Sequence, residues 1–348
     1  MSSNQILLAC HQGNLDYLKS LDSPVINEKV EDDHGANCVH FAARGGSVET
    51  LEFLVKERGL SPSKRSNVGA TPLHDAAAAG KLHALKWLKK NSNSNDNDQD
   101  GTGATILHLA AMYGNLSVVE WILENTECDI EEKSASGSMP IHFAVVGGDC
   151  GTVAKLLDEK PSSVNLQTIN GASTIYLAAQ SGHLDILRLL TQKRGISKIN
   201  AYDGMAPLHA AAQMGNLDCV KFLIEEQKCN PNERDFDGAT PLHFAASRGH
   251  HKVVEWLMQE GNAKVTLDNL GGSPLHNAAE VGNIKVVKTL LDNGCSPDIV
   301  DNAGLTAAEL AENCYHEVCA KTIRSKVRSN YLKLYFELGP VISYDSLS

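Results

Sequence analysis

Histidine is the residue type whose number and spacing most suggest chemistry in this sequence. The chain has 14 histidines in 348 residues, and imidazole side chains bind metal ions and transfer protons near neutral pH. Seven of them recur at steps of 33 or 34 residues, if Tyr176 is counted as filling one place in the series. These seven are His40, His74, His108, His142, His209, His243 and His276. A metal site or an acid–base site is the first chemical hypothesis.

The regular spacing argues against that hypothesis. Helix layers pack roughly 8–10 Å apart, so imidazoles that lie one repeat apart are too distant to share a metal ion. His250 and His251 are adjacent, but no third ligand stands at a metal-binding spacing from them. The sequence has no nucleophile elbow, phosphate-binding loop or H-E-x-x-H motif. We therefore expect structural histidines, no cofactor, no metal ion and no enzymatic activity.

The elements that position these histidines are copies of one unit, which is clearest in Asp237–Met258. Gly238 stands where a tight turn needs a positive φ, Thr240 can cap a helix and Pro241 suits the first helical turn. The first helix ends at Gly249, and a second amphipathic helix follows. Such a helical hairpin cannot bury its own apolar face, so neighbouring copies must cover it.

Ten copies of this unit can be aligned along the chain. The residues at the position of His243 are Leu7, His40, His74, His108, His142, Tyr176, His209, His243, His276 and Glu309. A period of 33 residues with a T-P-L-H core is typical of ankyrin repeats, which this chain resembles. The resemblance implies an all-α ankyrin-repeat solenoid of about ten helix-turn-helix repeats with short β-hairpin fingers.

We expect one domain at 1–328 and a separate C-terminal tail at 329–348. Within the domain, the expected parts are an N-terminal cap at about 1–33, internal repeats at about 34–302 and a C-terminal cap at about 303–328. The last helix should end near Arg328. Tyr331–Leu338 is aromatic and apolar, so it should pack on the last repeat, with a short docking motif as the alternative. Asn91–Asp100 is a polar run, for which we expect a solvated loop, with a mobile lip on a binding groove as the alternative.

Charge and cysteine content restrict the partners and the compartment. The net charge of −11 disfavours nucleic acids and anionic membranes and favours a basic partner. The nine cysteines form no C-x-x-C pair, and no apolar run is long enough to span a bilayer. We expect reduced thiols and a cytoplasmic monomer.

The surface that remains for function is a concave groove of finger tips and first-helix positions. Apolar residues just after the repeated histidine, together with aspartates of the fingers, predict a site for an extended basic peptide that carries hydrophobic anchors. For any single aspartate, shaping its own turn is the simpler explanation. The candidate residues are Phe41, Asp75, Leu109, Met112, Tyr113, Phe143, Leu177, Asp203, Met214, Asp235, Asp237, Phe244 and Arg248.

A more specific resemblance rests on the repeat variants and on the tyrosine at 176. The stretches GATPLHDAAAAG, DGMAPLHAAAQMG, DGATPLHFAASRG and GGSPLHNAAEVG, with Tyr176, resemble the N-terminal ankyrin domain of the espin and forked family of actin-bundling proteins over roughly residues 1–325. That resemblance implies a groove for a class III myosin tail segment or an intramolecular mimic, and a protein of the actin cytoskeleton. The proline-rich, actin-monomer-binding and basic bundling regions of that family have no counterpart here. Direct actin bundling is therefore not expected, and the chain should be a short isoform or a fragment.

Two other functions stay open at this point. One is a generic ankyrin regulator, such as a transcription-factor inhibitor or an enzyme-targeting subunit. The other is an enzyme that uses Cys314, Cys319 or the histidine series.

Overall fold

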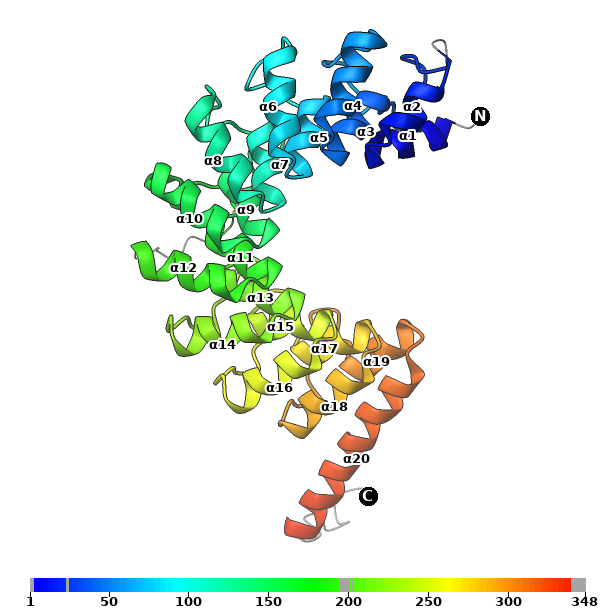
Figure 1. Ribbon diagram of the computed structural model, residues 1–348. Helices are drawn as coiled ribbons and strands as arrows, with labels where there is room; N and C mark the ends of the chain where they lie inside the picture. Colours follow the sequence, from blue (N-terminus) through cyan, green and yellow to red (C-terminus); the bar gives the residue numbers. More distant parts are fainter. Residues whose placement is uncertain (1–2, 23–24, 195–200, 202, 339–348) are drawn as a thin grey trace. The chain divides into compact units, whose positions relative to one another are not determined.

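The computed structural model describes residues 3–22, 25–194, 201 and 203–338, with the side chains of 193–194 and 330–338 left out. Over these residues the chain forms twenty α-helices, arranged as ten successive hairpins (Figure 1). The first helices of the hairpins are α1 (Ser3–Gln12), α3 (Cys38–Gly45), α5 (Pro72–Ala78), α7 (Ile106–Met112), α9 (Pro140–Gly147), α11 (Thr174–Ser181), α13 (Pro207–Met214), α15 (Pro241–Ser247), α17 (Pro274–Glu280) and α19 (Ala307–Asn313). The predicted all-α repeat architecture is confirmed.

The second helices are longer on average and are amphipathic. They are α2 (Leu15–Ser20), α4 (Val48–Glu52), α6 (Leu82–Asn91), α8 (Leu116–Asn125), α10 (Cys150–Glu159), α12 (Leu184–Arg194), α14 (Leu217–Glu225), α16 (His251–Gln259), α18 (Ile284–Asp292) and α20 (Glu317–Leu338). A π-helical turn, η1 (Phe53–Glu57), continues α4, and a 3₁₀ turn, η2 (Pro161–Asn165), follows α10.

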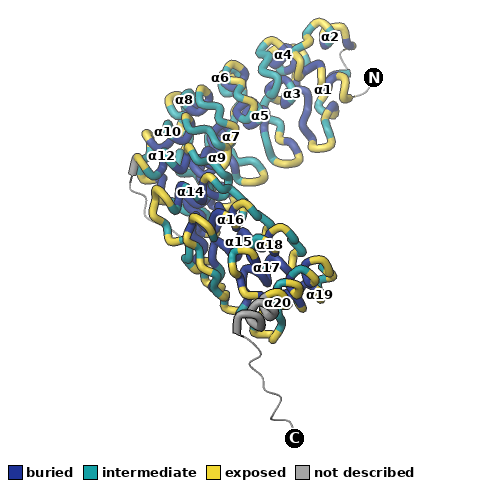
Figure 2. The backbone as a smooth tube through the Cα atoms, turned by 90° about the horizontal axis from the view of Figure 1, so that it is seen from below, coloured by how far each residue is buried: buried dark blue, intermediate teal, exposed yellow. Residues whose placement is uncertain are grey.

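The chain divides into two compact units. Unit 1 comprises Met1–Ala178 with Asp185–Ser197, and unit 2 comprises Ala179–Leu184 with Lys198–Ser348. In unit 1 the first helices α1, α3, α5, α7 and α9 stack in order, and in unit 2 the first helices α13, α15, α17 and α19 do the same. The buried segments lie mainly along the helices, and many exposed segments lie at the loops (Figure 2).

Small residues allow the first helices to pack closely. The first helices other than α19 carry a pair of apolar residues two and three places after the position of the repeated histidine. Examples are Ala76 and Ala77 in α5 and Ala245 and Ala246 in α15, and these four alanines are completely buried. Because alanine costs no side-chain entropy and allows neighbouring backbones to approach, this pair suits the interface between repeats.

The repeated histidine joins its own repeat to the next one by hydrogen bonds. In α7, His108 Nδ1 accepts the backbone N–H of Thr105 at 3.1 Å, which fixes the proton on Nε2, and Nε2 then donates to the carbonyl of Ser138 in the next repeat at 3.1 Å. The other histidines of the series make the same two kinds of bond, with carbonyl acceptors 24 to 30 residues further along the chain. In the last repeat, Glu309 takes the place of histidine and accepts the N–H of Thr306 at 2.8 Å, which completes a capping box.

The fingers are tight turns and not extended hairpins. In the finger at 235–238, the N–H of Asp235 donates to the carbonyl of Ala239 at 3.0 Å, and Gly238 adopts a φ of +76°. A Cβ on Gly238 would lie 2.5 Å from Asn269 Oδ1 of the next finger. Among the described residues the expected β-hairpins are reduced to isolated antiparallel bridges, at Glu31–Asn37, Gln167–Ser173 and Val300–Thr306, because each turn closes within five residues.

A second set of contacts joins the repeats at the start of each second helix. Asn115 Nδ2, for example, donates to the carbonyls of Ala77 and Ala78 at 2.8 and 2.9 Å, at the end of α5 in the preceding repeat. The glycine that precedes this position has a positive φ in nine repeats. Gly114 shows why: a Cβ there would meet Asp149 of the next repeat at 2.8 Å. In the last repeat the same position is Tyr315, with a φ of +62° and 92% exposure.

Two expectations outside the regular repeat are wrong. The last helix, α20, does not end near Arg328 but continues to Leu338, so it includes part of the predicted tail. The side chains of 330–338 and all of 339–348 lie outside the described residues. The prediction that Tyr331–Leu338 packs on the last repeat, and its alternative of a docking motif, therefore fall outside the described structure.

The polar run Asn91–Asp100 is not a solvated loop. Its side chains bond to the backbone of the following repeat: Asp96 Oδ2 accepts the N–H of Glu127 at 3.1 Å, and Asn97 Oδ1 accepts the N–H of Asp129 at 2.8 Å. The carbonyl of Asp98 accepts Nε2 of His74 at 3.1 Å. The second half of the run is therefore held by polar contacts with the next repeat, and residues 96–100 are half-buried.

Candidate protein-interaction surface

One row of side chains in unit 1 follows the position immediately after the repeated histidine. Each first helix contributes one member, and they are Leu8, Phe41, Asp75, Leu109, Phe143 and Leu177. Leu8 is 53% exposed and the other five are half-buried. Because five members are large and apolar, the row presents a mostly hydrophobic strip on the first-helix face of unit 1.

Three predicted site residues meet in one hollow of this strip. Met112 of α7, Phe143 of α9 and Leu177 of α11 line a hollow of about 210 Å³, together with Val146 and with Ser136, Ser138 and His142 near the adjoining finger. Met112 and Val146 are 36% and 41% exposed. The hollow is apolar with a few hydroxyl groups at its edge, which is suited to one or two hydrophobic side chains of a partner.

A second hollow lies at the N-terminal end of the strip. It has a volume of about 460 Å³ and is lined by Asn4, Leu7, Leu8, His11, Asp32, Phe41 and Arg44. The Arg44 guanidinium lies 5.1 Å from the centre of the Phe41 ring, and its Nε is 3.0 Å from Asp75 Oδ1. Arg44 therefore joins the apolar hollow to the one charged member of the row.

The carboxylate of Asp75 is an unusual group for a first-helix face. Burial raises the pKa of Asp75 to about 6, although Arg44 favours the charged form and so opposes the shift. Its Oδ2 is buried and has no hydrogen-bond partner among the described residues. Asp75 thus forms an ion pair within the protein, and this pair positions the Arg44 guanidinium over the Phe41 ring.

The predicted residues of unit 2 divide into structural and exposed groups. Phe244 packs edge-on against His209, with ring centres 5.7 Å apart, as Phe143 does against His108 in unit 1 at 4.9 Å. Met214 is 52% exposed, and Arg248 is exposed as well. In unit 1, Tyr113 is 61% exposed. The exposed side chains are the ones available to a partner.

The three predicted finger aspartates of unit 2 also differ in role. Asp235 accepts the N–H of Ala239 at 2.8 Å within its own turn, and burial raises the pKa of its carboxyl. Asp203 accepts the N–H of Met205 at 3.0 Å but is exposed. Asp237 is exposed at the finger tip. The structural explanation therefore holds for Asp235, whereas Asp203 and Asp237 present charge to solvent.

The histidine series is occupied by structural bonds. Burial lowers the pKa of His40 and of His108 to about 4, and it lowers the pKa values of His74, His142, His209 and His243 as well. Both ring nitrogens already have partners. Over the part of the chain that the structure describes, no group of three or more His, Cys, Asp or Glu residues could hold a metal ion.

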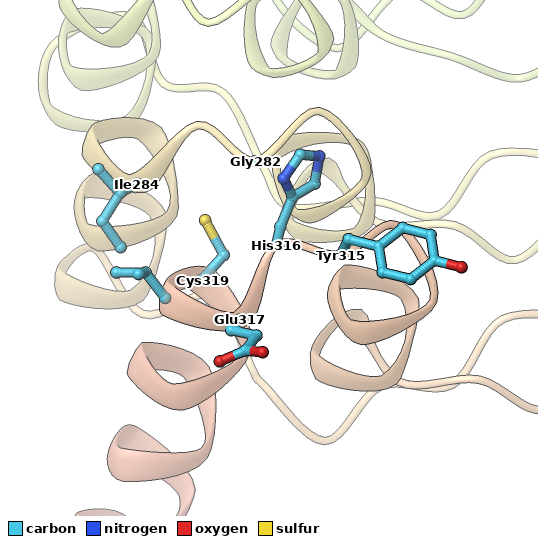
Figure 3. Close-up of a pocket in the computed structure, with 7 residues that line it drawn as sticks. Gly282, Ile284, Tyr315, His316, Glu317 and Cys319 are labelled. Atoms are coloured by element: carbon cyan, nitrogen blue, oxygen red, sulfur yellow. The ribbon is translucent and has the colours of Figure 1, made fainter.

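Cys319, one of the two cysteines proposed for catalysis, lines a third hollow at the last repeat. This hollow of about 490 Å³ is lined by Gly282, Ile284, Tyr315, His316, Glu317, Val318 and Cys319 (Figure 3). Cys319 is buried, and burial raises the pKa of its thiol, which disfavours the thiolate that a nucleophile needs. His316 lies against Gly282 in the hollow (Figure 3). This geometry gives a catalytic role little support.

The comparison with protein families decides the class of the protein. A family model described as ankyrin repeats (3 copies) matches residues 6–98, 59–134, 141–235 and 227–301, which is well over half of the chain. The chain belongs to the ankyrin-repeat family. Ankyrin-repeat domains are generally non-catalytic modules that bind other proteins, and the hollows of this ankyrin-repeat protein are consistent with that general role.

The comparison with solved structures agrees with the fold. The crystal structure of the human ASB11 ankyrin repeat domain is similar to this chain, with a TM-score of 0.56 and 24% identity, covering 63% of this chain and 98% of that chain. At this identity the similarity shows the ankyrin fold alone. The search of curated protein sequences found no match. None of the described helices is both long and apolar enough to cross a membrane.

Several exposed residues escaped the prediction from sequence. Leu8 and Val146 line the two hollows of unit 1, and both could have been found by extending the alignment of first helices to every repeat. The middle positions of the finger turns also carry large exposed side chains, at Val68, Ile169, Phe236 and Leu270. The turn glycine that follows each of them by one or two residues marks the turn, but it does not predict an apolar side chain there.

Proposed function

We propose that this ankyrin-repeat protein is a non-catalytic scaffold that holds an extended basic protein segment with apolar anchors. The observation that carries the proposal is the hollow of unit 1, in which Met112, Phe143 and Leu177 come from three successive first helices. Half-buried apolar side chains on a rigid surface are the usual basis of strong contacts at protein interfaces. The anchors of the partner would fill this hollow and thereby set its residence time.

The expected charge of the partner follows from the charge of the protein. The net charge is −11, and the exposed carboxylates Asp203 and Asp237 lie on finger tips of unit 2. A basic segment would associate faster with such a surface, and added salt would slow its association.

The identity of the partner is the more specific part of the proposal, and it rests on the resemblance to the espin and forked family. It is a tail segment of a class III myosin, or an intramolecular mimic of that segment. We place the protein in the cytoplasm as a monomer associated with the actin cytoskeleton, where it would reach actin bundles indirectly through its partner.

The proposal is tested by calorimetric titration with a class III myosin tail peptide at two salt concentrations. We expect binding that weakens as salt rises. We also expect a loss of about thirtyfold in affinity in a Met112→Ser, Val146→Ser variant, because each substitution removes apolar contact area worth about 1 kcal/mol, or about 2 kcal/mol together. Val318→Ser, at a residue of α20 that is 66% exposed, is the matched control. Absence of binding would reject the myosin partner, and equal affinity of the variant and the control would reject the hollow.

The charge of the fingers is tested with a pair of variants. Asp237→Lys should slow association several-fold without lowering stability, since its carboxylate is exposed. Asp235→Lys should instead destabilise the finger, because it removes the acceptor of the Ala239 N–H. Stopped-flow association kinetics and thermal unfolding separate the two effects. An unchanged on-rate in Asp237→Lys contradicts the role of the acidic fingers.

A further inference from the structure

A cluster of large apolar side chains covers three successive finger tips of unit 2. Phe236 is 73% exposed, Leu270 75%, Val300 53% and Leu267 40%. Phe236 lies in the finger at 235–238 and Leu270 in the finger at 268–271. Leu267 and Val300 directly precede the fingers at 268–271 and 301–304. We call these four residues the fingertip patch. Exposed apolar side chains are common singly, but a contiguous group of them marks a binding surface.

Unit 1 shows that this clustering is not a general property of the fingers. Its exposed finger residues, Val68 and Ile169, are 54% and 62% exposed. Two fingers, at 100–103 and 134–137, separate them, and those fingers carry no large exposed apolar side chain in the described structure. Unit 1 therefore provides natural controls for the fingertip patch.

The finger tips of unit 2 are held in a fixed order by backbone hydrogen bonds. Phe236 N–H donates to the carbonyl of Asp203 at 3.1 Å, Asn269 N–H to that of Asp237 at 2.9 Å, and Asn302 N–H to that of Leu270 at 2.9 Å. These bonds fix the backbones of adjacent fingers relative to one another. The apolar side chains are thus presented to solvent on a pre-organised surface, which lowers the entropy cost of binding.

The charges around the patch are mostly negative. The finger tips carry Asp203, Asp235, Asp237, Asp268 and Asp301. Among the described residues of these fingers and those directly before them, Arg234 is the one cation, so five negative charges and one positive charge leave a net charge of −4. Arg234 is also engaged, since its Nη2 donates to the carbonyl of Leu267 at 2.7 Å. An anionic lipid surface would be repelled here, whereas a cationic protein segment would be attracted.

The spacing of the fingers limits the conformation of that segment. Successive repeats stack at roughly 8–10 Å, so Leu267 and Val300, at equivalent places in adjacent fingers, lie about one such step apart. A polyproline II helix rises about 3.1 Å per residue with three residues per turn, so every third side chain points the same way at intervals of about 9 Å. A β-strand repeats its side-chain direction at about 7 Å and fits the fingers less well.

We propose that the fingertip patch docks a cationic protein segment in polyproline II conformation with an apolar side chain at every third residue. The inference rests on the proposed function, that the repeats hold a basic segment, and it adds a second anchoring surface in unit 2. Leu267 and Val300, at equivalent places, contact two successive anchors of the segment, and Phe236 and Leu270, in the second and third places of their turns, supply the most exposed apolar surface beside them. The surrounding aspartates select for lysine or arginine between the anchors.

The test uses the whole chain and a dye-labelled peptide of about twelve residues that repeats Leu-Pro-Lys, which favours the polyproline II conformation. Fluorescence anisotropy compares it with a Leu-Pro-Glu repeat and a Ser-Pro-Lys repeat of the same length. We expect the Leu-Pro-Lys peptide to bind at least tenfold more tightly than either control peptide. In Phe236→Ser, Leu270→Ser this preference should be lost, whereas Val68→Ser, Ile169→Ser should keep it.

Three results would overturn the proposal. They are no preference for the Leu-Pro-Lys peptide, equal losses in the unit 2 and unit 1 variants, and binding of the patch to neutral phosphatidylcholine vesicles in place of the peptide. The Met112→Ser, Val146→Ser variant separates this proposal from the proposed function. If that variant alone loses the Leu-Pro-Lys peptide, the fingertip patch is wrong and the hollow stands; if only the fingertip variant loses it, the fingertip patch stands whatever the myosin titration shows.

Discussion

Replacement of His108 by leucine tests whether the hydrogen bonds of the repeated histidine stabilise the contact between successive repeats. His108 is completely buried, accepts the N–H of Thr105 and donates to the carbonyl of Ser138. Leucine has a similar size, so His108→Leu removes the hydrogen bonds and leaves most of the packing. The variant leaves the buried N–H of Thr105 without a partner, which costs about 1–3 kcal/mol, and it removes one of two bonds to the carbonyl of Ser138, which still accepts the N–H of Ser134. We therefore expect a loss of about 2–4 kcal/mol in unfolding free energy at neutral pH.

The same substitution should change how stability depends on pH. The pKa of His108 falls from 6.5 to about 4 on folding, so between these values the unfolded chain binds a proton that the folded chain does not. The contribution of neutral, buried His108 to the unfolding free energy is thus fully present above pH 6.5, and it is lost as the pH falls through about 4. The loss from this one histidine amounts to about 3 kcal/mol. Because leucine cannot titrate, the difference in unfolding free energy between the parent protein and His108→Leu should be about 3 kcal/mol smaller at low pH than at neutral pH.

The assay must report on unit 1 alone, because the chain has two compact units. Its three tryptophans allow this: Trp87 and Trp121 lie in unit 1 and Trp256 in unit 2. In a Trp256→Phe background, urea unfolding followed by tryptophan fluorescence measures unit 1 at several pH values. His34→Gln, at an exposed finger histidine, is the control and should change the unfolding free energy by less than about 0.5 kcal/mol. A destabilisation by His108→Leu that stays the same from neutral to acidic pH would refute the reasoning.

Three further substitutions test other contacts. Tyr315→Gly should stabilise the last repeat by about 1 kcal/mol in thermal unfolding followed by Trp256 fluorescence, since the side chain is exposed and its backbone has a positive φ; a lower melting temperature would contradict this. Arg44→Ala leaves Asp75, whose pKa is raised to about 6, without its cation. This substitution should lower the unfolding free energy by about 1–2 kcal/mol above pH 6 and by less below pH 6, because protonated Asp75 needs no cation. Urea unfolding above and below pH 6 checks the direction of this pH dependence. Asn115→Ala should cost about 1–2 kcal/mol in the same assay, through the lost bonds to the end of α5, and an unchanged midpoint would contradict that role.

The repeat fold was predictable because the residues that define it are the ones that local geometry requires. Gly238 is needed for a positive φ, and His243 for two bonds at opposite ends of one ring. Since such requirements recur in every repeat, the number and order of the hairpins follow from the spacing alone. The same logic predicts Met112, Phe143 and Leu177 as residues of one binding surface, and the structure adds that they line one hollow.

The remaining features depend on contacts between repeats that a local pattern does not contain. Nothing between Arg328 and Leu338 breaks a helix, so α20 continues beyond the repeat. The polar run at 91–100 is ordered by bonds to residues some thirty positions away. The fingertip patch was missed because the middle of a finger turn accepts almost any residue, so Phe236 and Leu270 leave no periodic signal.

Tyr315 has a consequence for how a gene of this kind can lengthen. A duplicated internal unit brings its own glycine and the polar residue that lies over it, so a new copy can be inserted between existing ones. A unit added after the last one would instead press that polar residue onto the Cβ of Tyr315, where the internal copies have only a hydrogen atom. Addition of a unit after the last repeat is therefore disfavoured, unless a mutation first introduces glycine at 315.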